Sequence, residues 1–269
     1  MKRIMLKRSI LNIRMLFVIV TNFIILFVSL FEYGIITVDG KTPGTTYDIL
    51  TMYTIPFAIS SFIIFAGIFP GLPYAFSYLE ERNSGYLKYI RTRINIGKYA
   101  KYKVLFSGLS GGLSVMIPGV MIFAVICLIG RKVIPGDNGH IFKQLMWAPY
   151  MYIWGGRFVL LLKAILLFLF GAMWAELALL FSNIFKNRYV AYVLPFLAYE
   201  LMWLVFPVGI WNPVYLVRSD FGRDIPVFIP YLVDMGYIVI LCLINMVLMK
   251  RRGRQWRANV WDYLRKTSL

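Results

Sequence analysis

Histidine, cysteine and charged residues are all scarce in this chain of 269 residues. With one histidine and two cysteines, it has almost nothing from which a zinc or haem site could be built. Both Cys127 and Cys242 fall in apolar runs, which favours two small hydrophobic side chains over a disulfide pair. The sequence therefore predicts no metal site and no cofactor bound by the chain itself.

Catalytic motifs are missing as well. No stretch matches G-x-x-x-x-G-K-[ST], the loop that cradles the phosphates of nucleotides. The segment 108–114 (GLSGGLS) contains a G-x-S-G sequence like that of rhomboid-type intramembrane proteases, but the only histidine, His140, falls in a distant loop. Small residues spaced four apart in this segment instead predict a face for close helix packing. We expect no catalytic residues, and no enzyme activity of the chain on its own.

Low charge comes with high hydropathy. Only 15% of the residues are charged, 60% are hydrophobic, and the mean hydropathy is +0.71. Several uncharged runs exceed the length of roughly 18 residues that is typical of a membrane-spanning helix. The composition predicts an all-α polytopic membrane protein with a single transmembrane domain over residues 1–269. The expected six spans lie at about 15–31, 50–76, 104–129, 158–182, 189–207 and 228–249.

The net charge of +17 would suggest nucleic acid as a partner in a soluble protein. No nucleic-acid-binding module accompanies it, so we expect no such partner and assign the charge to the membrane topology. Lysine and arginine gather in the N-terminal arm, in 78–103, in 183–188 and in the tail from Lys250. Because basic loops stay in the cytoplasm, both termini are predicted to be cytoplasmic. The N-terminal arm, 4–16, and the tail are expected to lie flat on the inner leaflet as amphipathic pieces.

Three features inside the expected spans are open to interpretation. Prolines 56, 70 and 73 predict bends or an unwound inner end in the second span. Glu176 and Glu200, in the fourth and fifth spans, are costly in a bilayer. They either line a translocation path, with a proton-linked carboxylate as one form of it, or make structural hydrogen bonds between helices. Asp234, near the outer end of the sixth span, is expected at the membrane interface.

One charged stretch, YLEERNSGYLKYIRTRINIGKYAKYK at 78–103, separates the second span from the third. Asn83 and Ser84 are suitable N-caps and Gly97 is a suitable stop, so we expect a helix from Ser84 to about Asn95. Its apolar face would comprise Tyr86, Leu87, Tyr89, Ile90 and Ile94. The pattern alone leaves two interpretations open, a membrane-anchoring surface helix or a helix that docks on a cytoplasmic partner.

Within this stretch, the pattern E-E-R-x-S-G-Y-L-x-x-I-x-T-R resembles the intracellular loop of ATP-binding-cassette (ABC) export permeases of the type-2 class. The resemblance implies an N-terminal amphipathic elbow helix, both termini inside, and a coupling helix between spans two and three that docks on a separate ATPase subunit. Members without a fused ATPase are mostly bacterial, which implies a bacterial plasma membrane. The coupling positions that it implies are Glu80, Glu81, Arg82, Gly85, Tyr86, Leu87, Ile90 and Arg91.

By this resemblance we expect the permease subunit of an ATP-driven exporter, paired with a second permease copy or a homologous permease. Two cytoplasmic ATPase subunits would bind ATP and magnesium. The cargo would be amphipathic or peptide-like, such as an antimicrobial or toxin peptide, a drug or a lipid, because thirteen methionines suit adaptable apolar contacts. Two alternatives are a self-contained proton- or ion-coupled carrier that uses Glu176 and Glu200, and a non-transporting immunity or scaffold protein in the membrane.

Overall fold

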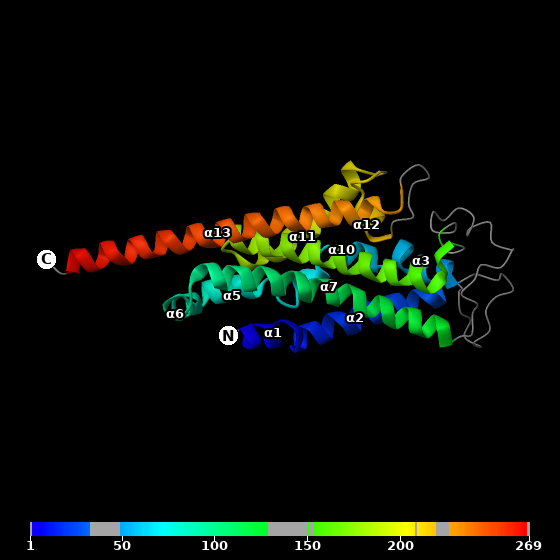
Figure 1. The fold of residues 1–269 in the computed structure, drawn as a ribbon, viewed down its shortest axis with the longest axis horizontal. Coiled ribbons are helices and arrows are strands. Elements are labelled where there is room, and N and C mark those ends of the chain that lie inside the picture. Colours follow the sequence, from blue (N-terminus) through cyan, green and yellow to red (C-terminus); the bar gives the residue numbers. More distant parts are fainter. Residues whose placement is uncertain are drawn as a thin grey trace.

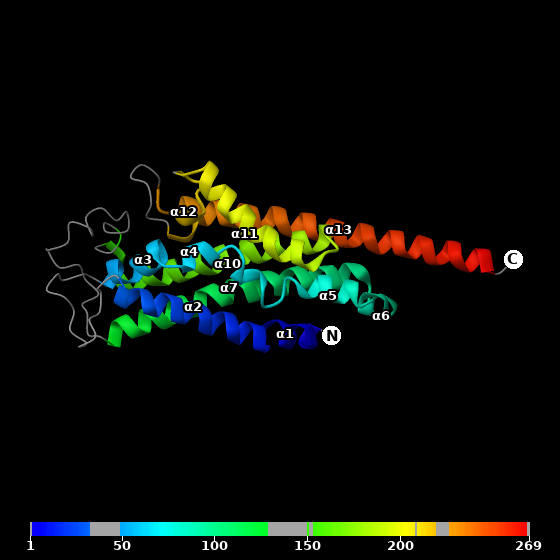
Figure 2. The ribbon, with the colours of Figure 1, turned by 180° about the vertical axis from the view of Figure 1, so that it is seen from behind.

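The computed structural model describes residues 2–32, 49–128, 150, 153–207, 209–218 and 226–267. The regular structure of these ranges is helical, and the helices run along one long axis (Figures 1 and 2). The helices are α1 (Lys2–Ile10), α2 (Ile13–Glu32), α3 (Ile49–Ile59), α4 (Phe62–Phe65), η1 (Phe69–Gly71), α5 (Ser77–Asn83), α6 (Tyr86–Arg93), α7 (Ile96–Leu128), α10 (Gly156–Ile184), α11 (Arg188–Val205), α12 (Pro213–Arg218) and α13 (Ile229–Thr267).

Within the described ranges, five helical stretches are long and apolar enough to cross a membrane. This confirms the prediction of an all-α membrane protein. The stretches are Arg3–Glu32, Ile96–Leu128, Phe158–Ile184, Arg188–Val205 and Ile229–Gly253.

The second expected span, at 50–76, is broken into α3, α4 and η1. Pro56 lies inside α3 and Pro70 in the first turn of η1, and a proline has no N–H for the helix ladder. The bends predicted from the prolines are therefore present, whereas a continuous span is not. The broken segment packs tightly all the same, because a Cβ on Gly71 would lie 2.6 Å from that of Ala178 in α10.

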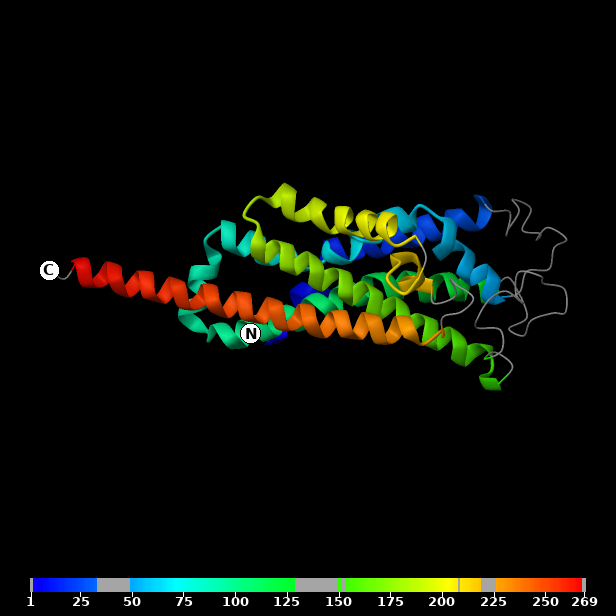
Figure 3. The ribbon, with the colours of Figure 1, turned by 90° about the horizontal axis from the view of Figure 1, so that it is seen from above.

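Helix α13 is 39 residues long and extends about 58 Å, roughly twice the hydrocarbon thickness of a bilayer. Its C-terminal part continues straight beyond the other helices (Figures 1 and 3). The expectation that the tail from Lys250 lies flat on the membrane is therefore wrong. The sequence after Pro230 contains no proline that would end the helix.

The N-terminal helix α1 continues the direction of α2 along the bundle instead of turning across it (Figures 1 and 2). This differs from an elbow that lies flat on the inner leaflet. The physical reason is that α1 is fastened to the bundle. Met5 and Ser9 are buried, and the guanidinium of Arg8 lies 3.5 Å from the carboxylate of Glu81. The N-terminus, α6 and the projecting end of α13 lie at one end of the bundle, here termed the α6 end (Figure 1).

Helices α7 and α10 form the tightly packed centre of the bundle. A Cβ on Gly111 would lie 2.2 Å from the Cβ of Ala175, and one on Gly171 would lie 2.4 Å from the carbonyl oxygen of Gly111. A Cβ on Gly112 would lie 2.5 Å from the ring of Phe168. Only glycine allows the two backbones to approach this closely. The packing face predicted from the small residues of 108–114 is confirmed.

Candidate functional site: the α5–α6 segment

The segment between the second and third passages folds into two short helices, α5 and α6, rather than one. The backbone of Gly85 has φ of +75°, in the left-handed region that favours glycine, and it turns the chain between them. Asn83 and Ser84 therefore end α5 instead of capping α6. Ile94 is extended and ends α6, so the predicted stop at Gly97 is wrong, and Gly97 lies in the first turn of α7.

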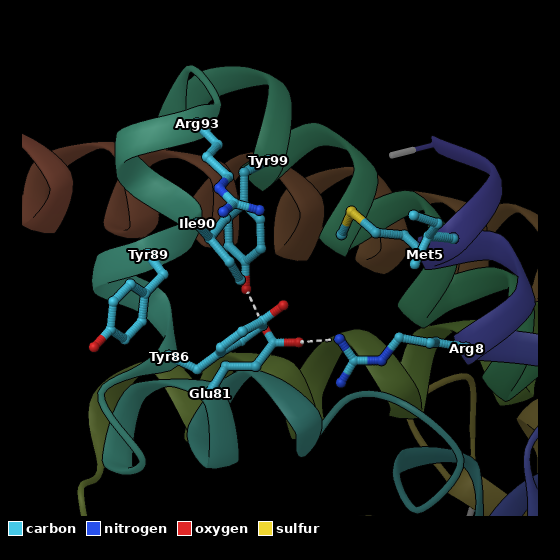
Figure 4. Close-up of a pocket in the computed structure, with 9 residues that line it drawn as sticks. Met5, Arg8, Glu81, Tyr86, Tyr89, Ile90, Arg93 and Tyr99 are labelled. Atoms are coloured by element: carbon cyan, nitrogen blue, oxygen red, sulfur yellow. Dashed lines mark hydrogen bonds and ion pairs between the residues drawn. The ribbon is translucent and has the colours of Figure 1, made fainter.

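Glu81 of α5 joins three helices through a buried charged cluster. Its carboxylate lies 3.5 Å from the guanidinium of Arg8 in α1 and 3.3 Å from the ammonium of Lys103 in α7. The hydroxyl of Tyr99 also donates to it, so Tyr99 and Arg8 reach Glu81 from different sides (Figure 4). The Lys103 ammonium, which is fully buried, donates in addition to the hydroxyl of Ser77, 2.6 Å away. A buried ion pair of this kind needs such extra hydrogen bonds, because both charges have left water.

Glu80, the neighbouring acid, points to a different pair of helices. Its carboxylate lies 2.8 Å from the guanidinium of Arg14 in α2 and accepts a hydrogen bond of 3.3 Å from the hydroxyl of Tyr192 in α11. The ion pair is exposed, with side-chain exposures of 49% for Arg14 and 44% for Glu80. Because water and salt screen such a pair, breaking it costs far less stability than breaking the buried pair of Glu81 and Lys103.

Arg82 binds the C-terminal end of α10. Its guanidinium donates to the carbonyl oxygens of Ser182 at 3.3 Å and Asn183 at 2.9 Å, and also to that of Phe185. These carbonyls have no partner within their own helix and carry the negative end of its dipole. Partial burial lowers the pKa of Arg82, and the neighbouring Arg252 lowers it further. The guanidinium is still protonated at neutral pH, because its usual pKa is so high. Arg82 is thus a fixed positive cap on α10.

The apolar face predicted for α6 is divided in the structure. Leu87 and Ile90 are only 4% and 5% exposed and pack into the bundle, whereas Tyr86 and Tyr89 are 49% and 69% exposed. Gly85 forms the turn, and the side chain of Arg91 lies outside the described residues. Among the predicted coupling positions, Glu80, Glu81, Arg82, Leu87 and Ile90 therefore hold the segment in place.

Tyr86 and Tyr89, here termed the tyrosine face, are exposed at the α6 end. They line one side of a cavity of about 320 Å³ between α6 and α1 (Figure 4). The other lining residues are Ile4, Met5, Arg8, Glu81, Ile90, Arg93 and Tyr99. Exposed tyrosine and arginine beside an apolar hollow is a composition enriched in protein–protein interfaces. The tyrosine face is therefore the candidate docking surface.

Within the membrane passages, Glu176 makes an interhelical hydrogen bond. The side-chain amide of Asn245 in α13 donates to the Glu176 carbonyl at 2.9 Å and to its carboxyl at 3.0 Å. Asn183 donates to Asn245 at 2.9 Å, which extends the network toward the end of α10. This geometry favours the structural interpretation of Glu176. Neither asparagine had been singled out from the sequence, although a polar side chain in an apolar run is a usable signal.

The other two acids lie elsewhere. Glu200 is half-buried on α11, and no polar contact in the described part of the chain joins it to Glu176. The structure thus does not bring the two glutamates together. Asp234 is fully buried near the start of α13, and its position at the membrane interface stays a prediction.

Two features of the sequence fall outside this description. His140 and most of the aromatic connection, 130–157, lie outside the described residues.

Comparison of the chain with protein-family models, with curated proteins and with solved structures found no match.

Proposed function

We propose that the chain is the membrane-spanning subunit of an ATP-driven exporter of the type-2 ABC class in the bacterial plasma membrane. Its tyrosine face would dock on a separate cytoplasmic ATPase. The resemblance of E-E-R-x-S-G-Y-L-x-x-I-x-T-R to the coupling loop of that class supports this proposal. The class implies two ATPase subunits and a second permease copy, with ATP and magnesium bound by the ATPases.

The proposal rests on one observation, namely that α5 and α6 make different contacts. The side chains of α5 hold α1, α7 and α10 through Glu81 and Arg82, whereas Tyr86 and Tyr89 on α6 are free to meet a partner. A helix that serves only as a membrane anchor does not need side chains that tie its neighbour to three helices of the bundle. A force on the tyrosine face would reach three helices through an ion pair and a helix cap, both of which resist deformation.

The proposed cycle follows from these contacts. Closure of the ATPase pair on ATP moves α6, and α5 transmits the movement to α7 and α10. The broken second passage packs on α10 at Gly71 and Ala178, so it would move with that helix. Discontinuous helices are a recurrent feature of translocation paths, because their backbone is uncoupled from a regular ladder. The path would carry an amphipathic or peptide-like cargo outward.

The docking function is tested with Tyr86→Asp combined with Tyr89→Asp. Ile90 is unsuitable for such a test, because it is buried and its replacement would disturb folding. The variant is co-expressed with the ABC ATPase encoded nearest to the chain in its genome, and co-purification is measured. We expect at least a roughly tenfold loss of bound ATPase, as for aromatic hot spots at interfaces.

The matched control is Tyr189→Asp, an equally polar change at a tyrosine that is 73% exposed at the start of α11. It should leave the bound ATPase unchanged. Equal retention of the ATPase by both variants would contradict the docking role. Cargo transport by the purified chain in liposomes without ATP would instead support the self-contained carrier.

A further inference from the structure

The cavity between α1 and α6 is lined by two guanidinium groups whose hydrogen-bond donors are unused. Arg8 comes from α1 and Arg93 from α6, on different sides of the cavity (Figure 4). The contact of Arg8 with Glu81 is 3.5 Å long, which is longer than a good N–H···O hydrogen bond. Arg93 forms no ion pair within the described ranges. Because each guanidinium carries five N–H donors, the cavity can supply several hydrogen bonds to an acceptor that enters it.

The acid in the cavity wall does not neutralise both arginines. The carboxylate of Glu81 is 3.3 Å from the buried ammonium of Lys103 and accepts a hydrogen bond from the hydroxyl of Tyr99. The charge of Lys103 therefore already balances that of Glu81. The positive charges of Arg8 and Arg93 then have no counterpart among the residues that line the cavity. An anion that enters the cavity meets a net positive charge.

The same cavity has an apolar wall. Met5 of α1 and Ile90 of α6 are only 5% exposed, and Ile4 and the ring of Tyr86 also line the cavity. Its volume of about 320 Å³ is at the lower end of the range of small-molecule sites. These dimensions suit a molecule of the size of a lipid headgroup rather than a peptide-like cargo. The ligand that fits this wall is an anion with an organic part.

The cavity lies at a depth that both lipid headgroups and dissolved molecules reach. The apolar run of the first passage begins at Met15, directly after Arg14. Arg8 precedes Arg14 by six positions, which corresponds to roughly 9 Å along a helix. The headgroup layer on each side of a bilayer is roughly 5–8 Å thick. The guanidinium of Arg8 is therefore close to the border between the headgroups and water.

We propose that this cavity binds a phosphate ester, with Arg8 and Arg93 in contact with its phosphate group and the apolar wall in contact with its organic part. The planar fork of a guanidinium matches a phosphate, because it donates two hydrogen bonds at once. Basic pockets at the cytoplasmic ends of membrane helices recurrently bind phospholipid headgroups, and the α6 end is predicted to be cytoplasmic. A ligand in contact with both arginines would join α6 to α1. The cavity is formed by this chain alone, so the site does not rest on the proposed function.

The test is isothermal titration calorimetry on the chain expressed alone and purified in a non-ionic detergent. The probes are dihexanoylphosphatidylglycerol, which represents a lipid headgroup, and glycerol 3-phosphate, which represents a soluble ester. We expect saturable binding of at least one probe. Arg93→Gln and Arg8→Gln should each weaken its affinity at least roughly tenfold, because a charge-assisted hydrogen bond is lost. Arg93→Gln is the decisive variant, because Arg93 has no ion pair in the described part of the chain whose loss would disturb folding.

The matched control is Arg251→Gln, which removes the same charge from an exposed arginine of α13 that does not line the cavity. Its affinity should equal that of the unchanged chain. Tighter binding of the phosphatidylglycerol would identify a lipid headgroup as the ligand, and equal or tighter binding of glycerol 3-phosphate would identify a soluble ester. The absence of saturable binding of both probes, or an equal loss of affinity in Arg251→Gln and Arg93→Gln, would overturn the site. No ATPase is present, so probe binding without ATPase co-purification would retain the site while the proposed function fails.

Discussion

The substitution Glu81→Gln tests whether the charge of this residue stabilises the folded chain. It removes the negative charge that faces the fully buried ammonium of Lys103. Loss of one partner leaves an uncompensated buried charge, which costs roughly 3–5 kcal/mol in folding stability. We therefore expect Glu81→Gln to lower the stability of the purified chain by about that amount.

The adjacent acid provides the control. Glu80→Gln disrupts an ion pair with Arg14 in which both side chains are more than one third exposed. Pairs of this kind contribute less than about 1 kcal/mol. The double change Glu81→Gln with Lys103→Met should recover most of the loss, because no charge is then left buried.

Stability is measured on detergent-purified protein, by denaturant titration and by the temperature at which the monodisperse peak is lost. The reasoning is refuted if Glu80→Gln and Glu81→Gln destabilise equally. It is also refuted if the double variant loses as much as the sum of its single changes, because the Lys103 and Glu81 charges would then be energetically independent.

Three more predictions concern the helix contacts. Gly111→Val should greatly reduce the yield of folded protein, whereas Gly97→Ala, in the first turn of the same helix, should not, because only at Gly111 would the Cβ meet a neighbour at 2.2 Å. Asn245→Leu should cost about 2–3 kcal/mol in denaturant titration, because the buried Glu176 carboxyl loses its donor, and a cost below about 0.5 kcal/mol would contradict the network. Arg82→Lys should retain the charge yet lower the thermal stability nearly as much as Arg82→Ala, because an ammonium cannot span several carbonyls of α10. Full retention of thermal stability by the lysine variant would contradict this role.

Hydropathy was enough to predict the membrane class and the positions of the long passages, because burial in a bilayer requires runs of apolar residues. A close helix contact along 108–114 was also predictable, because small residues spaced four apart let two helix backbones approach each other. The prolines of 50–76 predicted the bends in the second passage. They did not predict its division into three short pieces or the close approach of Gly71 to Ala178 of α10.

The candidate site was predictable in place but not in arrangement. An apolar stripe shows that α6 is amphipathic, whereas the rotation of the helix about its axis decides which members of the stripe face the bundle. That rotation follows from the turn at Gly85, so Leu87 and Ile90 point inward while the tyrosines point out. Lys103 was counted as a basic residue of a cytoplasmic connection. It is fully buried, because α7 begins at Ile96 and turns the ammonium toward Glu81.

Long-range contacts lie beyond such patterns. Arg82 and the carbonyls of α10 are separated by about a hundred positions, and Asn183 and Asn245 by 62. No periodicity relates segments at these separations. Their contacts become visible only when the bundle is assembled.

The central claim is that the tyrosine face contacts an ATPase. Its most direct test replaces Tyr89 with the photoreactive amino acid p-benzoylphenylalanine in cells that express the neighbouring ATPase, with Tyr189 replaced as the control. Irradiation and mass spectrometry identify what is bound. The account predicts a covalent product from position 89, and none from position 189, with a protein that carries a G-x-x-x-x-G-K-[ST] motif. Products with lipid alone, or the same products from both positions, would contradict it.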